Sequence, residues 1–125
     1  MTRHRTVTDH SLENEYPKLI RDKIPQIIKQ KDGIDVPVRS LSDKEFLLYL
    51  LKKILEETQE LSRAESDENL KEEIADVYEI IDALVELKKF SKSDIAALQD
   101  EKREKRGGFK QRLLMLDKKS ADSAA

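Results

Sequence analysis

The chain has 125 residues, of which 40% are charged and 38% are hydrophobic, and its formal net charge is −2. This nearly neutral balance gives no global electrostatic basis for binding nucleic acid or a membrane surface, so neither is expected as a partner. The absence of cysteine excludes disulfides, thiol nucleophiles and thiolate metal sites.

The first 15 residues are polar and aperiodic, and they predict a disordered N-terminal tail. Both histidines, His4 and His10, lie in this tail and are expected to be solvated rather than to bind a metal. No apolar run resembles a signal peptide or reaches the length of a membrane span, so a cytoplasmic location is expected.

The first patterned segment is "YPKLIRDKIPQIIKQKDG", in which apolar residues recur at helical spacing. It predicts a short helix from about Ile24 to Lys31, with Pro25 in the first turn and Asp32-Gly33 as its end. The following "IDVPVRSL" is short and interrupted by proline, which predicts an extended connector or a small edge strand.

A second helix is predicted from Ser42 to about Arg63, because Ser42 and Glu45 have the spacing of a capping box. Its inward-facing residues are expected to be Phe46, Leu47, Leu50, Leu51, Ile54, Leu55 and Leu61. A third helix follows a cap at Ser66 or Asp67, with a buried stripe of Ile74, Val77, Ile81, Leu84 and Val85.

A fourth helix is predicted from a cap at Ser91 to about Arg106, where Gly107-Gly108 ends it. The apolar "FKQRLLML" is expected to dock back on the helices, and residues 117–125 are expected to form a frayed tail. The predicted fold is therefore all-α, an antiparallel bundle of about four helices formed by residues 16–116.

Two pairs of acidic residues interrupt apolar runs in the second and third predicted helices. Glu57 and Glu60 are three residues apart, as are Glu73 and Asp76, so each pair projects from one helix face. A short break between the helices predicts an antiparallel hairpin, in which the two pairs face each other. Such carboxylates would repel one another unless a hard divalent cation, Mg²⁺ or Mn²⁺, lay between them.

The pattern alone leaves a second interpretation open, because helix surfaces commonly carry solvated glutamates. A single acidic pair at this spacing is usually structural, whereas two pairs on successive helices are a stronger indication of a metal site. A di-iron carboxylate centre is not expected, because no predicted helix contains the histidines that such centres use.

These residues resemble a known family. The segments "EETQE" and "EIAD" are similar to the ExxE…ExxD metal motif of the all-α nucleoside triphosphate pyrophosphatases. That superfamily includes MazG, the dimeric dUTPases, dCTP pyrophosphatase and phosphoribosyl-ATP pyrophosphohydrolase. The segments "YPKLIRDKIPQII" and "EKREKRGGFKQRLLM" resemble the opening and the ending of a phosphoribosyl-ATP pyrophosphohydrolase-like, MazG-like subgroup. The similarity extends from Tyr16 to Leu116.

The resemblance implies Mg²⁺-dependent hydrolysis of a nucleoside triphosphate between its α and β phosphates, giving a monophosphate and pyrophosphate. It implies house-cleaning of non-standard or excess dNTPs as the biological role. The implied metal ligands are Glu57, Glu60, Glu73 and Asp76. Glu56 resembles an extra acid of the motif, and its implied role is catalytic, either binding a second ion or orienting the attacking water.

Two basic segments are candidates for binding the substrate phosphates, since arginine and lysine both suit phosphate oxygens. The predicted substrate-binding residues are Lys18, Arg21, Lys23, Lys102, Arg103, Lys105, Arg106 and Phe109. For the four cations before Gly107, a solvated helix end favoured by the helix dipole is an equally open interpretation. Tyr16 and Phe109 are candidates for stacking on a base, but the sequence does not indicate which base.

Two other functions are compatible with the sequence. One is phosphoribosyl-ATP pyrophosphohydrolase of histidine biosynthesis, against which the "YPKLIRDKIP" opening argues. The other is a non-enzymatic helical module for oligomerisation or RNA binding. A homodimer or homotetramer is expected, because apolar residues such as those of "LLML" would otherwise be exposed.

Overall fold

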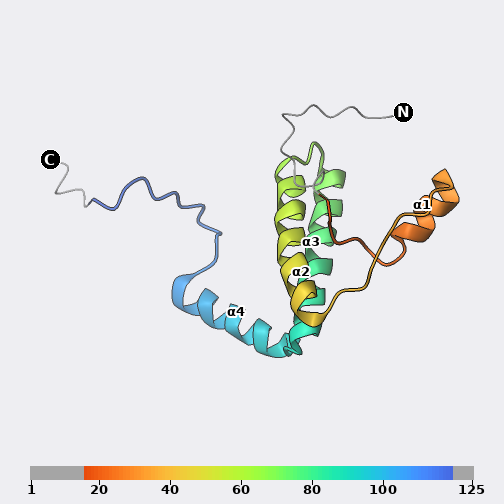
Figure 1. Cartoon of the computed structure of the whole chain (residues 1–125). Coiled ribbons are helices and arrows are strands. Elements are labelled where there is room, and N and C mark those ends of the chain that lie inside the picture. Colours follow the sequence, from red (N-terminus) through yellow and green to blue (C-terminus); the bar gives the residue numbers. More distant parts are fainter. Residues whose placement is uncertain (1–15, 120–125) are drawn as a thin grey trace. The chain divides into compact units, whose positions relative to one another are not determined.

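The computed structural model describes residues 16–119, and Figure 1 shows them as four helices with irregular connections. The helices are α1 (Ile24–Asp32), α2 (Asp43–Ser62), α3 (Asp67–Lys88) and α4 (Lys92–Arg106). No strand occurs within residues 16–119, so the predicted all-α fold is confirmed and residues 34–41 form an extended connector. The predictions for residues 1–15, including both histidines, and for residues 120–125 lie outside the described residues.

The helices begin and end where the local chemistry predicts. Ser42 Oγ accepts a hydrogen bond from the Glu45 amide at 3.2 Å, and Glu45 Oε1 accepts one from the Ser42 amide at 3.3 Å. This capping box satisfies two amides that the first turn of α2 cannot pair. The predicted caps of α3 and α4 are also confirmed, since Ser66 and Ser91 accept hydrogen bonds from the amides of Asn69 and Asp94.

The chain leaves α1 and α3 through residues in the left-handed region. Gly33 ends α1 at a φ of 71°, where glycine meets no steric penalty. Lys89 ends α3 at a φ of 56°, a conformation that a lysine adopts only with strain. None of the described helices is long and apolar enough to cross a membrane.

The main helix packing in the described chain joins α2 and α3, which lie side by side as an antiparallel hairpin (Figure 1). Leu50 on α2 and Ile80 on α3 are the buried hydrophobic residues of this part of the chain, at 2% and 7% exposure. A four-residue connection, 63–66, joins the two helices and keeps them adjacent. The hairpin is the framework that positions the acidic residues.

The predicted buried stripes are partly wrong. On α3 the residue at the centre of the packed face is Ile80, whereas Ile74 and Ile81, both predicted to be buried, are 37% and 41% exposed. On α2, Leu51 and Leu55 are 47% and 60% exposed instead of facing inward. Both helices carry apolar residues on more than one face, so helical spacing alone did not determine which face meets the partner helix.

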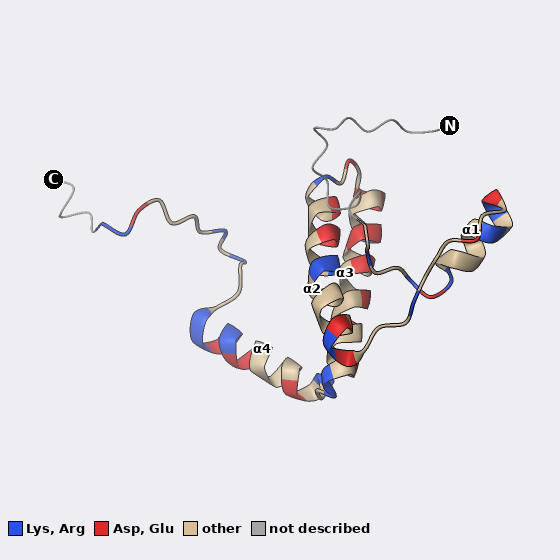
Figure 2. Cartoon of the chain, viewed as in Figure 1, with Lys and Arg blue, Asp and Glu red and all other residues tan. Residues whose placement is uncertain are grey.

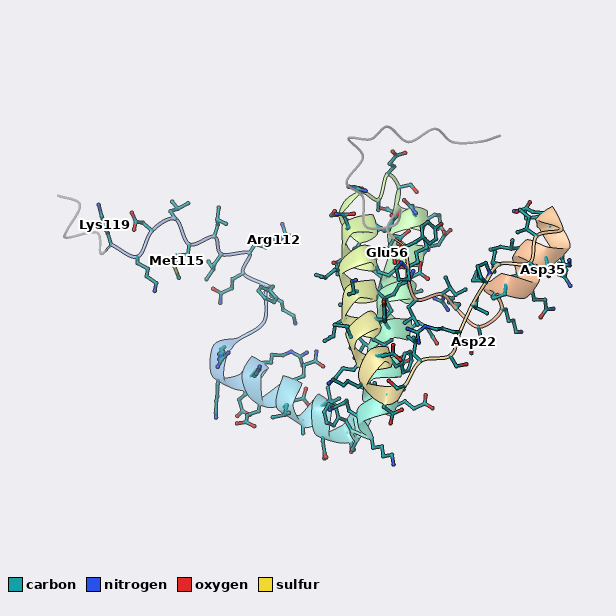
Figure 3. The ribbon with its side chains drawn as sticks, viewed as in Figure 1. Asp22, Asp35, Glu56, Arg112, Met115 and Lys119 are labelled. Carbon is teal, nitrogen blue, oxygen red and sulfur yellow. The ribbon has the colours of Figure 1, made fainter. Side chains whose placement is uncertain are left out.

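The chain divides into two compact units, one ending at Phe90 and one beginning at Ser91. The second unit contains α4, which ends at Gly107, followed by a segment without helix that includes Phe109. The apolar residues of this segment project from an extended backbone (Figure 3, where Met115 is labelled). Leu113 and Leu116 are 84% and 89% exposed. Their docking on the helices stays a prediction.

Candidate metal centre

The acidic residues occupy positions that continue the packed faces of α2 and α3. Glu57 follows the buried Leu50 by seven residues, and Glu73 precedes the buried Ile80 by seven. Seven residues are close to two helical turns, so each acid lies on the same face as its apolar counterpart, one layer nearer the connection between the helices. Figure 2 shows acidic residues, in red, on both helices in this region. The hairpin therefore contains an acidic layer next to its apolar one.

Three carboxylates converge in this layer. Glu57, Glu73 and Asp76 each offer one oxygen, and these oxygens all lie within 4.8 Å of one another. The three side chains are half-buried, and Glu73 Oε2 is buried without a hydrogen-bond partner among the described residues. Leaving a buried polar atom unpaired costs about 1–3 kcal/mol, so this oxygen of Glu73 is a place where a cation or a donor would be stabilising.

This set of carboxylates fits a small hard cation. Oxygens on opposite sides of an octahedral Mg²⁺ are about 4.2 Å apart, twice the usual Mg–O distance. Adjacent oxygens of the octahedron are about 3.0 Å apart, so three oxygens that lie within 4.8 Å of one another would have to draw together to bind one ion. Carboxylate-only ligation favours Mg²⁺ or Mn²⁺ over zinc, and Mg²⁺ keeps several waters, so three protein ligands are sufficient.

The electrostatics of the metal-free layer disfavour its negative charge. Burial raises the pKa of Glu57 above its ordinary value, and the nearby Asp76 and Glu56 add to the rise, while Lys53 opposes it. Burial also raises the pKa of Glu73, and the negative charge of Asp76 adds to that rise. Burial and the neighbouring acids therefore outweigh the cations and hydrogen bonds that reach these two carboxyl groups, and a bound divalent cation would reverse both directions.

Glu60, the fourth predicted ligand, is half-buried one turn beyond Glu57 on α2. It is not one of the three residues whose oxygens converge. Its role as a ligand therefore stays a prediction.

Glu56, the predicted catalytic acid, is 6% exposed and lies on α2 (Figure 3). Its Oε2 is 2.7 Å from Lys53 Nζ, and its Oε1 is 3.7 Å from Lys18 Nζ. These contacts make Glu56 an anchor for two lysines beside the acidic layer. A direct part in the reaction stays a prediction.

Lys53 belongs to the site, although it was not among the site residues predicted from the sequence. Its ammonium lies 2.7 Å from Glu56 Oε2 and 3.5 Å from Glu57 Oε1, and its side chain is only 18% exposed. The signal was present in the sequence, because lysine at positions i−3 and i−4 from two glutamates predicts pairing along one helix face.

A cleft with a volume of about 820 Å³ adjoins the acidic layer. This volume lies within the range of pockets that hold small molecules and cofactors. Its walls come from the segment 16–21, from α1, from the connector 36–41, and from α2 and α3. The lining residues are Tyr16, Pro17, Lys18, Leu19, Ile20, Arg21, Ile24, Ile28, Val36, Pro37, Val38, Arg39, Leu41, Tyr49, Lys53, Glu57 and Asp76.

The cleft extends along α2 from the acidic layer to the start of the helix, where Arg39 and Leu41 line it. Tyr49, Lys53 and Glu57 are spaced four residues apart on one face of α2 and mark a length of about 12 Å along the helix. Glu57 and Asp76 lie at the end that contains the acidic layer. Leu41 lies at the other end, because it directly precedes the N-cap of α2. A ligand that fills the cleft would therefore contact the acidic layer at one end and the connector at the other.

The cations of the N-terminal segment differ in their contacts. Arg21 Nη2 donates a hydrogen bond to Asp76 Oδ1 at 2.7 Å, so it reaches the acidic layer directly. Lys18 contacts Glu56, and its Nζ also lies 5.1 Å from the centroid of the Tyr16 ring. Lys23 is exposed at the start of α1 and is not part of the cleft lining. For all three, phosphate binding stays a prediction.

The other predicted phosphate ligands belong to the second unit. Lys102, Arg103, Lys105 and Arg106 lie in the last turns of α4, where blue gathers in Figure 2. Arg103 pairs with Asp100 at 3.2 Å and Lys105 with Glu101 at 2.8 Å, and all of these side chains are exposed. Phe109 is 97% exposed. Their role in substrate binding stays a prediction.

Comparison with known proteins adds no relative, because no family model, curated protein or solved structure matches this chain. The resemblance to the all-α pyrophosphatases therefore depends on the motifs themselves. The chain's function is inferred from those motifs and from the geometry of the hairpin and the cleft.

Proposed function

We propose that the chain is a Mg²⁺-dependent nucleoside triphosphate pyrophosphohydrolase that cleaves between the α and β phosphates and releases a monophosphate and pyrophosphate. House-cleaning of non-standard or excess dNTPs is the biological role that suits this chemistry. One observation carries the proposal. Three carboxylates from two helices converge at the end of a cleft of about 820 Å³, and one oxygen of Glu73 among them is buried without a hydrogen-bond partner in the described chain.

Three groups of residues have different roles in this proposal. Glu57, Glu73 and Asp76 would hold the Mg²⁺ ion, with Glu60 as the predicted fourth ligand. The bound ion supplies positive charge for the phosphate oxygens and lowers the pKa of a coordinated water. Lys53 and Arg21 line the same end of the cleft and offer N–H donors to phosphate oxygens.

Glu56 positions Lys53 in this scheme. Because Glu56 is buried and holds the ammonium at 2.7 Å, Lys53 keeps a fixed place on the face of α2. A fixed cation does not have to lose side-chain freedom when the substrate binds. The apolar residues of the connector and α1 are available to cover the nucleobase.

The same proposal includes a homodimer or homotetramer. The hairpin exposes a second apolar stripe on each helix, at helical spacing and away from the packed face. These residues are Leu48, Leu51 and Leu55 on α2, exposed at 56%, 47% and 60%, and Leu70, Ile74, Tyr78 and Ile81 on α3, exposed at 39%, 37%, 66% and 41%. Apolar stripes of this kind are typical of surfaces that a second copy covers.

The test is pyrophosphate release across a panel of dNTPs, NTPs and phosphoribosyl-ATP, with Mg²⁺, with Mn²⁺ and with a chelator. Wild type is compared with Glu73→Gln and Glu60→Gln, and with Glu72→Gln as the matched control, an exposed neighbour on the same helix. We expect turnover that requires the metal, is lost in Glu73→Gln and is retained in Glu72→Gln. No metal-dependent turnover of any nucleotide would contradict the proposal.

The same panel separates the alternatives. Turnover of phosphoribosyl-ATP alone would assign the chain to histidine biosynthesis. A non-enzymatic oligomerisation or RNA-binding module would show no turnover and no dependence on Glu73.

A further inference from the structure

The ion pair between Arg21 and Asp76 joins two residues to which the proposed function gives different tasks. Arg21 Nη2 lies 2.7 Å from Asp76 Oδ1, and both residues line the cleft. Asp76 is also one of the three acids whose oxygens converge. In the chain alone, the guanidinium therefore neutralises a carboxylate that a divalent cation would need.

This pair can be exchanged at small cost. The side chain of Arg21 is 56% exposed and that of Asp76 is 37% exposed. Ion pairs with such exposure contribute little to stability, because water already screens the charges. A hard divalent cation that contacts Glu57 and Glu73 as well as Asp76 gains three carboxylates, whereas Arg21 gains only one.

A second contact keeps the segment in place when Arg21 leaves. Lys18, three residues earlier, lies 3.7 Å from Glu56, and these side chains are only 25% and 8% exposed. Glu56 is held in turn by Lys53. Arg21 would therefore remain at the wall of the cleft, with its planar set of donors available to phosphate oxygens.

We propose that Arg21 is exchanged between Asp76 and the phosphates of the substrate. It pairs with Asp76 in the metal-free chain, is displaced when a divalent cation binds, and then binds the triphosphate in the cleft. This inference rests on the proposed function and adds an order of binding to it, with the cation before the nucleotide. By thermodynamic linkage, a nucleotide that draws Arg21 away also tightens cation binding by the same factor.

The first experiment is a Mn²⁺ titration without nucleotide, followed by electron paramagnetic resonance of the free ion. Wild type is compared with Arg21→Gln and with Lys29→Gln. Lys29 is the matched control because it forms an exposed ion pair with Asp35 at 2.9 Å and does not line the cleft. We expect Arg21→Gln to bind Mn²⁺ about 2- to 5-fold more tightly, because the competing cation is gone. Unchanged or weaker binding would overturn the inference.

The second experiment measures binding of a non-hydrolysable α,β-methylene nucleoside triphosphate by calorimetry at saturating Mg²⁺. Here Arg21→Gln should bind roughly tenfold more weakly, the usual effect of losing a charge-assisted hydrogen bond. Arg21→Lys keeps the charge and should fall between wild type and Arg21→Gln in both experiments. If Arg21→Gln binds both Mn²⁺ and the nucleotide analogue more weakly than wild type, Arg21 only supports the local structure, which overturns the exchange.

The two proposals fail in different ways. If wild type binds neither Mn²⁺ nor the analogue, the proposed function itself is wrong. If wild type binds both and Arg21→Gln does not tighten Mn²⁺, only the exchange is wrong.

Discussion

The α2–α3 hairpin and α4 carry acids and cations at the same helical spacings, but the two regions use them differently. In α4, Arg103 pairs with Asp100 and Lys105 with Glu101, and all four side chains are more than half exposed. At the hairpin, Arg21 of the N-terminal segment reaches Asp76 of α3 across 55 residues of sequence, and Glu56 of α2 is buried between two lysines. Pairs within one exposed helix stabilise it slightly. Pairs that join separate segments around a buried acidic layer organise a site.

The largest expected difference between the hairpin and α4 is in the effect of losing one acid on kcat. Replacing Glu73 with glutamine should lower kcat by about 10³-fold or more, because a charge that holds the cation at the reacting phosphates is lost. Replacing Glu101 on α4 with glutamine should change kcat less than twofold, because its partner is a solvated lysine. Steady-state pyrophosphate release measures both variants. Equal losses in the two would remove the distinction between the regions.

The next difference is in stability without metal. Replacing Glu73 with methionine extends the apolar stripe of Ile80 and removes a buried, unpaired oxygen. In a chelator this substitution should raise the free energy of unfolding by about 1–3 kcal/mol. Urea unfolding with and without Mg²⁺ provides the measurement.

With Mg²⁺ present, wild type should become more stable to unfolding than Glu73→Met, because an ion that binds only the folded wild type stabilises it. Glu101→Met is the control and should stay within about 0.5 kcal/mol of wild type. A destabilised Glu73→Met in chelator would mean that the acidic layer is already satisfied without an ion.

The pH dependence of stability should differ on the two sides of the ordinary glutamate pKa near 4.5. The pKa values of Glu57 and Glu73 are raised in the folded chain, so these residues bind more protons when folded than when unfolded. As pH rises from about 4.5 through those raised values, the chelated protein should therefore lose stability. Melting temperatures between pH 4 and 8 test this, and excess Mg²⁺ should abolish the loss.

Glu45 acts in the opposite direction at lower pH. Hydrogen bonds from Arg39 and from the Ser42 amide lower its pKa to about 2. Its contribution is present above about 4.5 and should be lost as pH falls from there towards 2. A chelated protein whose stability rises steadily from pH 4 to 8 would contradict the assignment for Glu57 and Glu73.

The smallest expected effect concerns α4. Replacing Arg103 and Lys105 together with glutamine should lower the free energy of unfolding by about 0.2–0.5 kcal/mol per helical pair. If the two cations also bind phosphate, as the sequence predicts, KM should rise several-fold while kcat is unchanged. An unchanged KM would leave α4 as a solvated helix with local pairs and would contradict its predicted role in substrate binding.

Local chemistry explains which features the sequence predicted well. Capping depends on residues three positions apart, so Ser42 and Glu45 defined the start of α2 without knowledge of the rest of the fold. The acidic layer was equally accessible, because Glu57, Glu73 and Asp76 lie on successive helices with a short connection. These predictions required only helical spacing and an antiparallel hairpin.

The features that the sequence did not reveal depend on which faces meet. Ile80 and Ile81 are both apolar, and only the packing of α2 against α3 decides that Ile80 is buried. The pairing of Arg21 with Asp76 joins segments 55 residues apart, and no local pattern encodes that contact. The cleft between the N-terminal segment, the connector and the hairpin follows from the same non-local arrangement.

The seven-residue offset between Leu50 and Glu57, repeated between Ile80 and Glu73, has a consequence for protein engineering. Each acid stands where a leucine or isoleucine would extend the packed face. A variant library selected only for heat resistance in a chelator would enrich apolar substitutions at Glu57 and Glu73. If the proposed function is right, the most heat-resistant variants from such a selection would have lost their pyrophosphohydrolase activity.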